Sequence, residues 1–151
     1  YKSAKQILPA VPILLLIAMV SATWMWGGIV PSLIYYGLEF IEPKTFLLVT
    51  CIVCSLISVL TGSSWTTCAT IGIAFMGIGT IMGYNEAWIA GAVISGAYFG
   101  DKMSPLSDTT VVASSSSGTP LFDHIKYMTI TTVPSLLITL IIKTNTEAIN
   151  N

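Results

Sequence analysis

Residues 6–38 contain no charged side chain, and this feature restricts the fold more than any other in the chain. A helix crosses the hydrocarbon core of a bilayer with about 17–25 residues, so the run is longer than one perpendicular pass requires. Gly27, Gly28 and Pro31 could break it, and aromatic residues typical of a membrane interface lie around them. We therefore expect one long or broken membrane helix at this end of the chain.

Further apolar segments of helical length follow, separated by short polar turns, at residues 46–60, 68–84, 87–100 and 127–142. We expect Pro134 to interrupt the last of them. Charged residues make up only 9% of the chain, whereas soluble domains carry about 25%. The expected fold is an all-α membrane protein with four to five transmembrane or broken helices. No polar linker divides the sequence, so residues 1–151 are expected to form one transmembrane domain.

Composition and spacing also weigh against other classes of protein. A net charge of −1 without any cluster of Lys or Arg gives no basic surface for nucleic acid. Cys51 and Cys54 have C-x-x-C spacing, but their apolar surroundings favour buried small side chains over redox chemistry. Two lysines precede the first apolar run, yet no convincing signal-peptide cleavage site follows. The chain resembles an internal piece of a longer membrane protein, and its lysines are too scattered to predict its orientation.

Two polar stretches, residues 61–67 and residues 100–110, interrupt the apolar pattern. Each follows a short apolar segment and precedes another. Residues 87–100 are too few to cross a bilayer alone, at about 1.5 Å per residue. Non-helical backbone at membrane depth survives only when it is buried in protein or lines a wet cavity. The pattern is therefore typical of the discontinuous helices that bind ions in secondary transporters.

The second stretch carries the side chains that could bind a sodium ion or a proton. Hydroxyl, carbonyl and carboxylate oxygens suit sodium, and a desolvated carboxyl group holds a proton more firmly than one in water. One carboxylate that holds either species is the simplest basis for exchange. The candidate oxygen donors of this stretch are Asp101, Ser104, Ser107, Asp108, Thr109 and Thr110.

An ordinary loop is an equally good interpretation of residues 100–110 from these arguments alone. Each charge at the centre of a membrane helix costs about 2.5–3.5 kcal/mol, and a surface loop avoids that cost. For residues 61–67, ligand binding and helix packing are equally good interpretations, since small residues also line the contacts between membrane helices. The repeats Gly79-x-x-x-Gly83 and Gly96-x-x-x-Gly100 favour packing.

Two remaining motifs suggest chemistry only weakly. His124 could carry protons, but its neighbours Asp123 and Lys126 favour a place at the membrane interface. The serine run at residues 114–117 has no partner base and no nucleophile-elbow context, so we do not expect an enzyme.

Three segments resemble the NhaC family of bacterial sodium/proton antiporters. They are GSSWTT at residues 62–67 with GIG at 77–79, AGAVISGAYFGDKMSPLSDTT at residues 90–110, and LFDHIKYM at residues 121–128. The resemblance covers most of the chain from residue 62 to residue 128. It departs at Val111, where many members carry asparagine, and at the serines of residues 114–117.

The resemblance implies a multi-pass transporter of the bacterial inner membrane, built as inverted repeats, of which this chain holds about one. It implies sodium/proton antiport by alternating access, with no cofactor beyond the transported sodium ion and proton. The implied partners are the lipid bilayer, the remainder of the same transporter chain and, as one option, a second copy in a homodimer.

Our hypothesis assigns the two carboxylates, Asp101 and Asp108, as competing sites for sodium and protons. Lys102 would balance their charge when the site is empty. The hydroxyls of residues 104–110 would complete the oxygen shell, and a second set of hydroxyls would lie across from them: Ser63, Ser64 and Thr66. We expect Asp108→Asn to abolish exchange and Asp101→Asn to act more mildly if Asp101 only caps a helix.

Two other functions stay open at this stage. A sodium-coupled malate/lactate antiporter would need a cation near the site, and Lys102 is the only local candidate. A non-transporting membrane scaffold subunit would show a closed polar stretch with no cavity that reaches Asp108.

Overall fold

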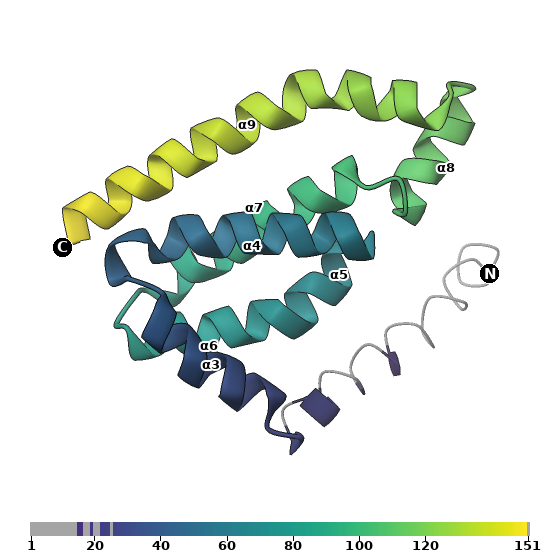
Figure 1. The fold of residues 1–151 in the computed structure, drawn as a ribbon. Helices are drawn as coiled ribbons and strands as arrows, with labels where there is room; N and C mark the ends of the chain where they lie inside the picture. Colours follow the sequence, from purple (N-terminus) through teal and green to yellow (C-terminus); the bar gives the residue numbers. More distant parts are fainter. Residues whose placement is uncertain (1–14, 17–18, 20–21, 25, 151) are drawn as a thin grey trace, which may run out of the picture.

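The computed structural model describes residues 15–16, 19, 22–24 and 26–150 as an assembly of helices without strands. Most of the first apolar run, and with it the expected first pass, lies outside the described residues. Figure 1 shows α4 and α7 side by side at the centre, with α5 and α6 on one side and α9 on the other. The helices from residue 29 onward are α3 (Ile29–Phe40), η1 (Pro43–Thr45), α4 (Phe46–Thr61), α5 (Ser64–Thr67), η2 (Cys68–Gly72), α6 (Ile73–Ile81), α7 (Glu86–Met103), α8 (Asp108–Ser117) and α9 (Leu121–Asn150).

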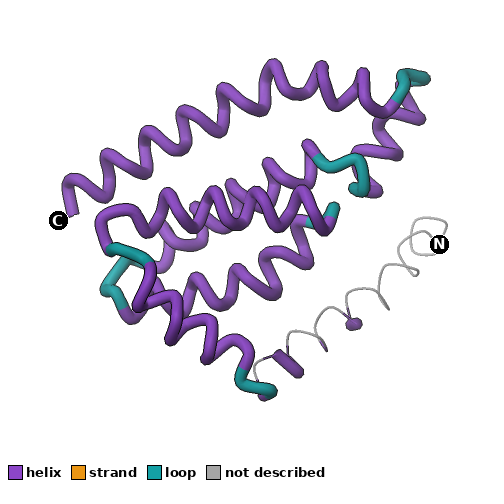
Figure 2. Tube along the Cα trace, in the orientation of Figure 1, coloured by secondary structure: helices purple, strands orange, loops and turns teal. Residues whose placement is uncertain are grey.

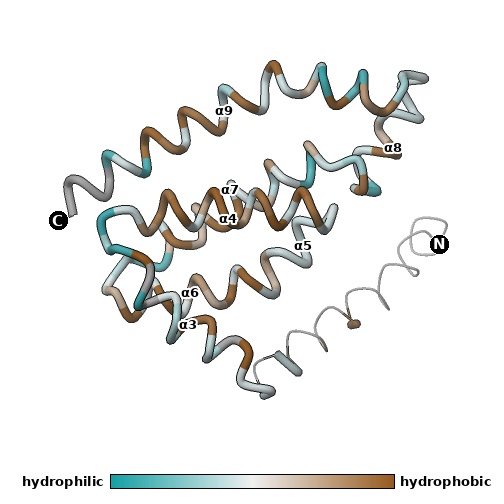
Figure 3. Tube along the Cα trace, viewed as in Figure 1, coloured by the Kyte–Doolittle hydropathy of each residue, from teal (hydrophilic) through white to brown (hydrophobic). Residues whose placement is uncertain are grey.

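The expectation of an all-α membrane protein is confirmed. Among the described residues, three helical segments are long and apolar enough to cross a bilayer: Pro43–Thr61, Ser64–Ile81 and Leu121–Asn145. The segment Ser64–Ile81 is one continuous helical run in which η2 is π-helical. Hydrophobic residues dominate α4, whereas hydrophilic residues gather where α7 ends (Figure 3).

The central pair, α4 and α7, runs parallel and in very close contact. A Cβ atom added to Gly96 would lie 2.3 Å from the carbonyl oxygen of Cys51, and one added to Gly100 would lie 2.3 Å from that of Ser55. Only glycine therefore allows the two backbones to approach so closely. The predicted packing role of Gly96-x-x-x-Gly100 is thus consistent with the structure, and this contact fixes the height of α7 against α4.

An aromatic and aliphatic core holds the opposite end of the pair. Phe46 and Ile89 are fully buried, and the ring of Phe46 lies 6.2 Å from Phe75 and 5.2 Å from Tyr84, between centroids. Helix α3 packs on α6, where a Cβ added to Gly77 would lie 2.6 Å from the Cδ1 of Ile34. The polar residues lie at the other end of the pair, where α4 and α7 have their C-termini.

The helices differ from the sequence-based expectation in two places. Helix α9 runs without a break through Pro134, where an interruption was expected. Membrane helices tolerate proline because local adjustments satisfy the freed carbonyl. The two polar breaks are also shorter than expected, since residues 64–67, 100–103 and 108–110 are helical. Figure 2 shows what remains of the breaks as two short loops at the same end of the pair.

Candidate functional site

The two breaks touch each other. Helix α4 ends at Gly62, whose φ of 69° is a left-handed conformation that suits glycine. A Cβ atom there would lie 2.7 Å from the carbonyl carbon of Leu106, in the break after α7. The Ser104 hydroxyl donates to the carbonyl oxygen of Val59 at 2.7 Å and ties the second break to α4. Because α4 and α7 are parallel, both carbonyl ends meet here.

Two serines start the helices that leave this junction. Ser63 caps α5, and its Oγ accepts from the Thr66 backbone N–H at 3.3 Å. Ser107 caps α8, and its Oγ accepts from the Thr110 backbone N–H at 3.4 Å. Such caps satisfy N–H groups that a helix start leaves without a partner. Two helix C-termini and two helix N-termini therefore converge in one place, as in the discontinuous helices of transporters.

Asp101 lies inside this junction and is only partly satisfied. Its side chain is 9% exposed, and its Oδ2 accepts a hydrogen bond from the Ser64 hydroxyl at 2.9 Å. Its Oδ1 is buried without a hydrogen-bond partner in the part of the chain that the structure describes. An unsatisfied buried group costs about 1–3 kcal/mol, and more when it is charged. A proton or a cation on this carboxylate would remove the cost.

Asp108 has different surroundings. Its side chain is exposed, and its Oδ1 accepts from the backbone N–H of Thr109 at 2.8 Å, in the first turn of α8. An acidic residue at a helix start is stabilised by the helix dipole without any ligand. The two predicted carboxylates thus differ, and of the two only Asp101 has a buried oxygen that lacks a donor among the described residues.

The other predicted hydroxyls bond mostly to backbone or to each other. Thr110, which is buried, donates at 3.3 Å to the carbonyl oxygen of Asp101 or at 3.4 Å to that of Lys102. Ser107 and Thr109 share a hydrogen bond at 2.8 Å between their hydroxyl oxygens. The Thr66 hydroxyl donates to Ser63 Oγ at 3.1 Å. These bonds hold the breaks in shape around Asp101.

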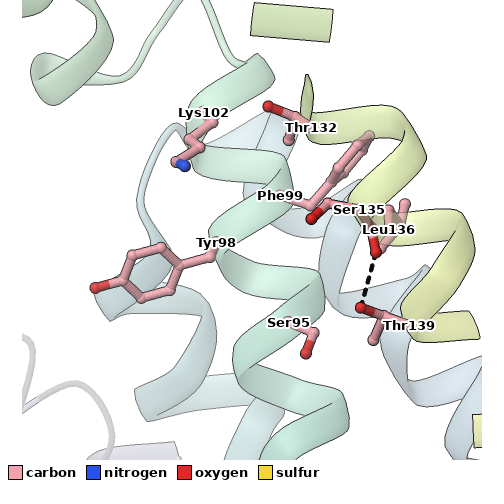
Figure 4. A pocket seen from close by; sticks show the side chains of 8 residues that line it. All are labelled: Ser95, Tyr98, Phe99, Lys102, Thr132, Ser135, Leu136 and Thr139. Atoms are coloured by element: carbon pink, nitrogen blue, oxygen red, sulfur yellow. Dashed lines mark hydrogen bonds between the residues drawn. The ribbon is translucent and has the colours of Figure 1, made fainter. Parts of the chain in front are cut away.

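Lys102 indicates how deep the junction lies. It borders a pocket of about 190 Å³ between α7 and α9, together with Thr132 and Ser135 of α9 (Figure 4). Those two residues are near the middle of the candidate span Leu121–Asn145. The end of α7 at Lys102 therefore lies beside the middle of that candidate span. No ion pair joins Lys102 to a carboxylate of the described residues.

A second pocket leads to the partner of Asp101. It has a volume of about 400 Å³ and is lined by Ser64, Trp65 and Cys68 from one side and by Ile94 and Tyr98 from α7. Sequence reasoning identified Ser64 but missed Trp65 and Tyr98. The signal for Tyr98 was its spacing, because Ile94, Tyr98 and Asp101 fall on one face of a helix at i, i+4 and i+7.

The remaining candidates lie away from this junction. Cys51 and Cys54 are buried and free, as expected for small core side chains. His124 lies in the first turns of α9, and its Nε2 is buried without a partner among the described residues. The residues that line the α9 side of the Lys102 pocket carry hydroxyls at helical spacing and were not identified from sequence: Thr132, Ser135 and Thr139.

Comparison with known proteins agrees with this arrangement of helices. The sequence model of the Na+/H+ antiporter family matches residues 2–144, nearly the whole chain. The chain belongs to the Na+/H+ antiporter family. The resemblance to NhaC antiporters is thereby confirmed.

Curated proteins whose names give different transported species are similar to this chain. It is 54% identical over 130 residues to the Na(+)/H(+) antiporter NhaC of Alkalihalophilus pseudofirmus, covering 86% of this chain and 28% of that protein. It is 52% identical over 137 residues to the malate-2H(+)/Na(+)-lactate antiporter of Bacillus subtilis, covering 91% and 29%. It is 44% identical over 121 residues to the arginine/ornithine antiporter ArcD of Halobacterium salinarum, covering 80% and 25%.

The chain spans less than a third of the length of these curated relatives. No solved structure matches it.

Proposed function

We propose that this chain is part of a secondary transporter that exchanges sodium ions for protons across the bacterial inner membrane by alternating access. The observation that carries the proposal is the buried carboxylate of Asp101, with one oxygen held by Ser64 and the other without a donor in the described part of the chain. The family supports the same function, since two of the similar proteins are named sodium/proton antiporters NhaC.

The geometry suggests how one site could serve both ions. The C-terminal ends of α4 and α7 point their carbonyl groups and negative dipole ends at the junction, which favours a cation there. A proton on Asp101 would neutralise the side chain and remove its attraction for sodium. Binding of either species therefore excludes the other, which is what exchange requires.

A transport assay on the full-length protein tests the assignment. In proteoliposomes with an imposed pH gradient, we expect Asp101→Asn to abolish sodium-dependent proton movement, because the amide can neither release a proton nor attract sodium. The matched control is Asp123→Asn, which removes an exposed carboxylate in the first turn of α9 and should exchange normally. Normal exchange by Asp101→Asn would refute the proposal.

A sodium-coupled carboxylate exchange is the alternative that has an observation of its own. Lys102 borders a pocket with the hydroxyl-bearing residues Thr132, Ser135 and Thr139, and one relative is named a malate/lactate antiporter. If the alternative holds, malate should drive sodium movement through the full-length protein. Sodium-dependent proton movement that is insensitive to malate and lactate favours plain sodium/proton exchange.

A further inference from the structure

The helical run that carries Ser64 changes its geometry soon after that residue. Helix α5 (Ser64–Thr67) passes without a break into η2 (Cys68–Gly72), which is π-helical, and then into α6 (Figure 1). A π-helical turn bonds residues five apart, is rare and often lies at a functional site. The proposed exchange of sodium for protons does not yet give this turn a role.

Two contacts show which way this run faces. A Cβ atom added to Gly72, in η2, would lie 2.7 Å from the Cγ1 of Val93 on α7. The Ser64 hydroxyl donates to Oδ2 of Asp101, which follows Val93 by eight residues on α7. Ser64 precedes Gly72 by eight residues as well. The run is therefore antiparallel to α7, and both Ser64 and Gly72 face that helix.

A regular α-helix would not let both residues face α7. Eight residues at 3.6 per turn advance about 80° beyond two full turns. A π turn takes up roughly one extra residue, so the same eight residues end about 20° short of two full turns. The π turn therefore directs Ser64 toward Asp101.

The same geometry gives the run a second state. If η2 took up α-helical hydrogen bonds while α6 stayed in place, α5 would turn by about 100°, the angle of one residue. Ser64 would then leave Asp101. The cap of α5 is local, since the Thr67 hydroxyl donates to the Ser63 carbonyl oxygen at 2.9 Å, and it can turn together with α5.

We propose that η2 is a hinge that brings the Ser64 hydroxyl to Asp101 and takes it away during each exchange cycle. The inference rests on the proposed function in taking Asp101 as the ion site. In the observed state the site offers sodium a hydroxyl and a carboxylate oxygen. In the turned state it offers the carboxylate without that hydroxyl, so the two states differ in their affinity for sodium, as release on one side of the membrane requires.

Deletion of Ala69 from η2 in the full-length transporter tests the hinge. The deletion leaves a regular α-helix in which Ser64 still faces Asp101, because seven residues end within about 20° of two full turns. We expect proton release from the purified protein on addition of sodium chloride to stay close to normal. Exchange in proteoliposomes should fall about ten-fold or more, since conformational steps limit many turnover rates. Normal exchange by this variant would overturn the proposal.

Insertion of one alanine after Ala69 is the matched control. It turns Ser64 by about 100° away from Asp101. Proton release should then require about ten-fold more sodium, as expected for loss of a hydrogen bond to a charged group. Loss of proton release in a correctly inserted deletion variant would contradict the inference, and so would an unchanged sodium requirement in the insertion variant.

Amide hydrogen exchange on the unmodified full-length protein decides the proposal even if neither variant folds. Residues 64–72 should exchange faster than residues 73–81, and sodium should slow them because it favours the state with Ser64 on Asp101. Equal rates in the two segments that sodium does not change would refute the hinge. The exchange function fails if sodium releases no proton from the unmodified protein, whereas the hinge alone fails if release is normal and the deletion variant exchanges normally.

Discussion

Asp101 and Asp108 carry the same functional group but face different physical situations. Asp101 is buried and has one oxygen without a donor among the described residues, whereas Asp108 is exposed and accepts a hydrogen bond from the backbone N–H of Thr109 in the first turn of α8. The cost of an unsatisfied buried carboxylate makes Asp101 the group that gains most from a proton or a cation. The structure therefore favours Asp101 over Asp108 as the residue that binds a sodium ion or a proton.

This shift changes the expected effect of Asp108→Asn. The amide oxygen of asparagine can still accept the hydrogen bond from the Thr109 backbone N–H, and Ser107, which caps α8, is unchanged. We now expect the full-length variant to keep sodium-dependent proton movement within a few-fold of the unmodified protein. Complete loss of exchange in a correctly inserted Asp108→Asn protein would restore the earlier assignment.

Ser64 should set the affinity of the site for sodium. Ser64→Ala removes the hydrogen bond to Oδ2 of Asp101 and the serine hydroxyl that lines the pocket beside it. Hydrogen bonds to charged groups are worth about 1.5–3 kcal/mol, so the sodium concentration for half-maximal exchange should rise about ten-fold or more. Ser64→Thr should restore much of the affinity, and Ser116→Ala on the exposed side of α8 should have no effect. An unchanged sodium dependence would exclude this role.

At the scale of helices, the site depends on the close contact of α4 and α7. Gly100→Ala would place a methyl group 2.3 Å from the Ser55 carbonyl oxygen, so the helices must separate. Overpacking of this kind costs about 1–3 kcal/mol, and we expect a clearly lower Tm for the full-length protein in detergent.

Gly91→Ala on the same helix is the matched control for that experiment. Its nearest neighbour within 4 Å would be the Nζ of Lys143 at 3.8 Å, an ordinary contact. Alanine also favours a helix over glycine by up to about 1 kcal/mol, so the Tm should stay the same or rise slightly. Equal losses of Tm in both variants would show that the α4–α7 contact is not the cause.

The sequence predicted the positions of the helices well where apolar periodicity determines them. It predicted the helix ends less well, because capping residues determine those. The apolar run at residues 46–60 became α4, and glycine spacing at residues 96–100 indicated close helix packing without identifying α4 as the partner. The breaks were expected at full width because Ser63 and Ser107 look like ordinary polar residues until the helix that each one caps is known. The burial of Asp101 could not be predicted, since it depends on where α5 returns against α7.

At the scale of the molecule, the polar junction must be reached by water if ions are to enter. Cys68 reports on this directly, because it lines the pocket beside Ser64, whereas Cys51 and Cys54 are fully buried. In the full-length protein, a water-soluble maleimide should label Cys68 and leave the other two unlabelled. Sodium should slow the labelling. Labelling of Cys51 or Cys54 in preference to Cys68 would contradict the position of the pocket.

The central claim is that one carboxylate, Asp101, holds either a proton or a sodium ion. Proton release from the purified full-length protein on addition of sodium chloride, followed in weakly buffered detergent solution with a pH-sensitive dye, tests it most directly. The account predicts release from the unmodified protein and from Asp108→Asn, and none from Asp101→Asn. Undiminished release from Asp101→Asn would contradict it.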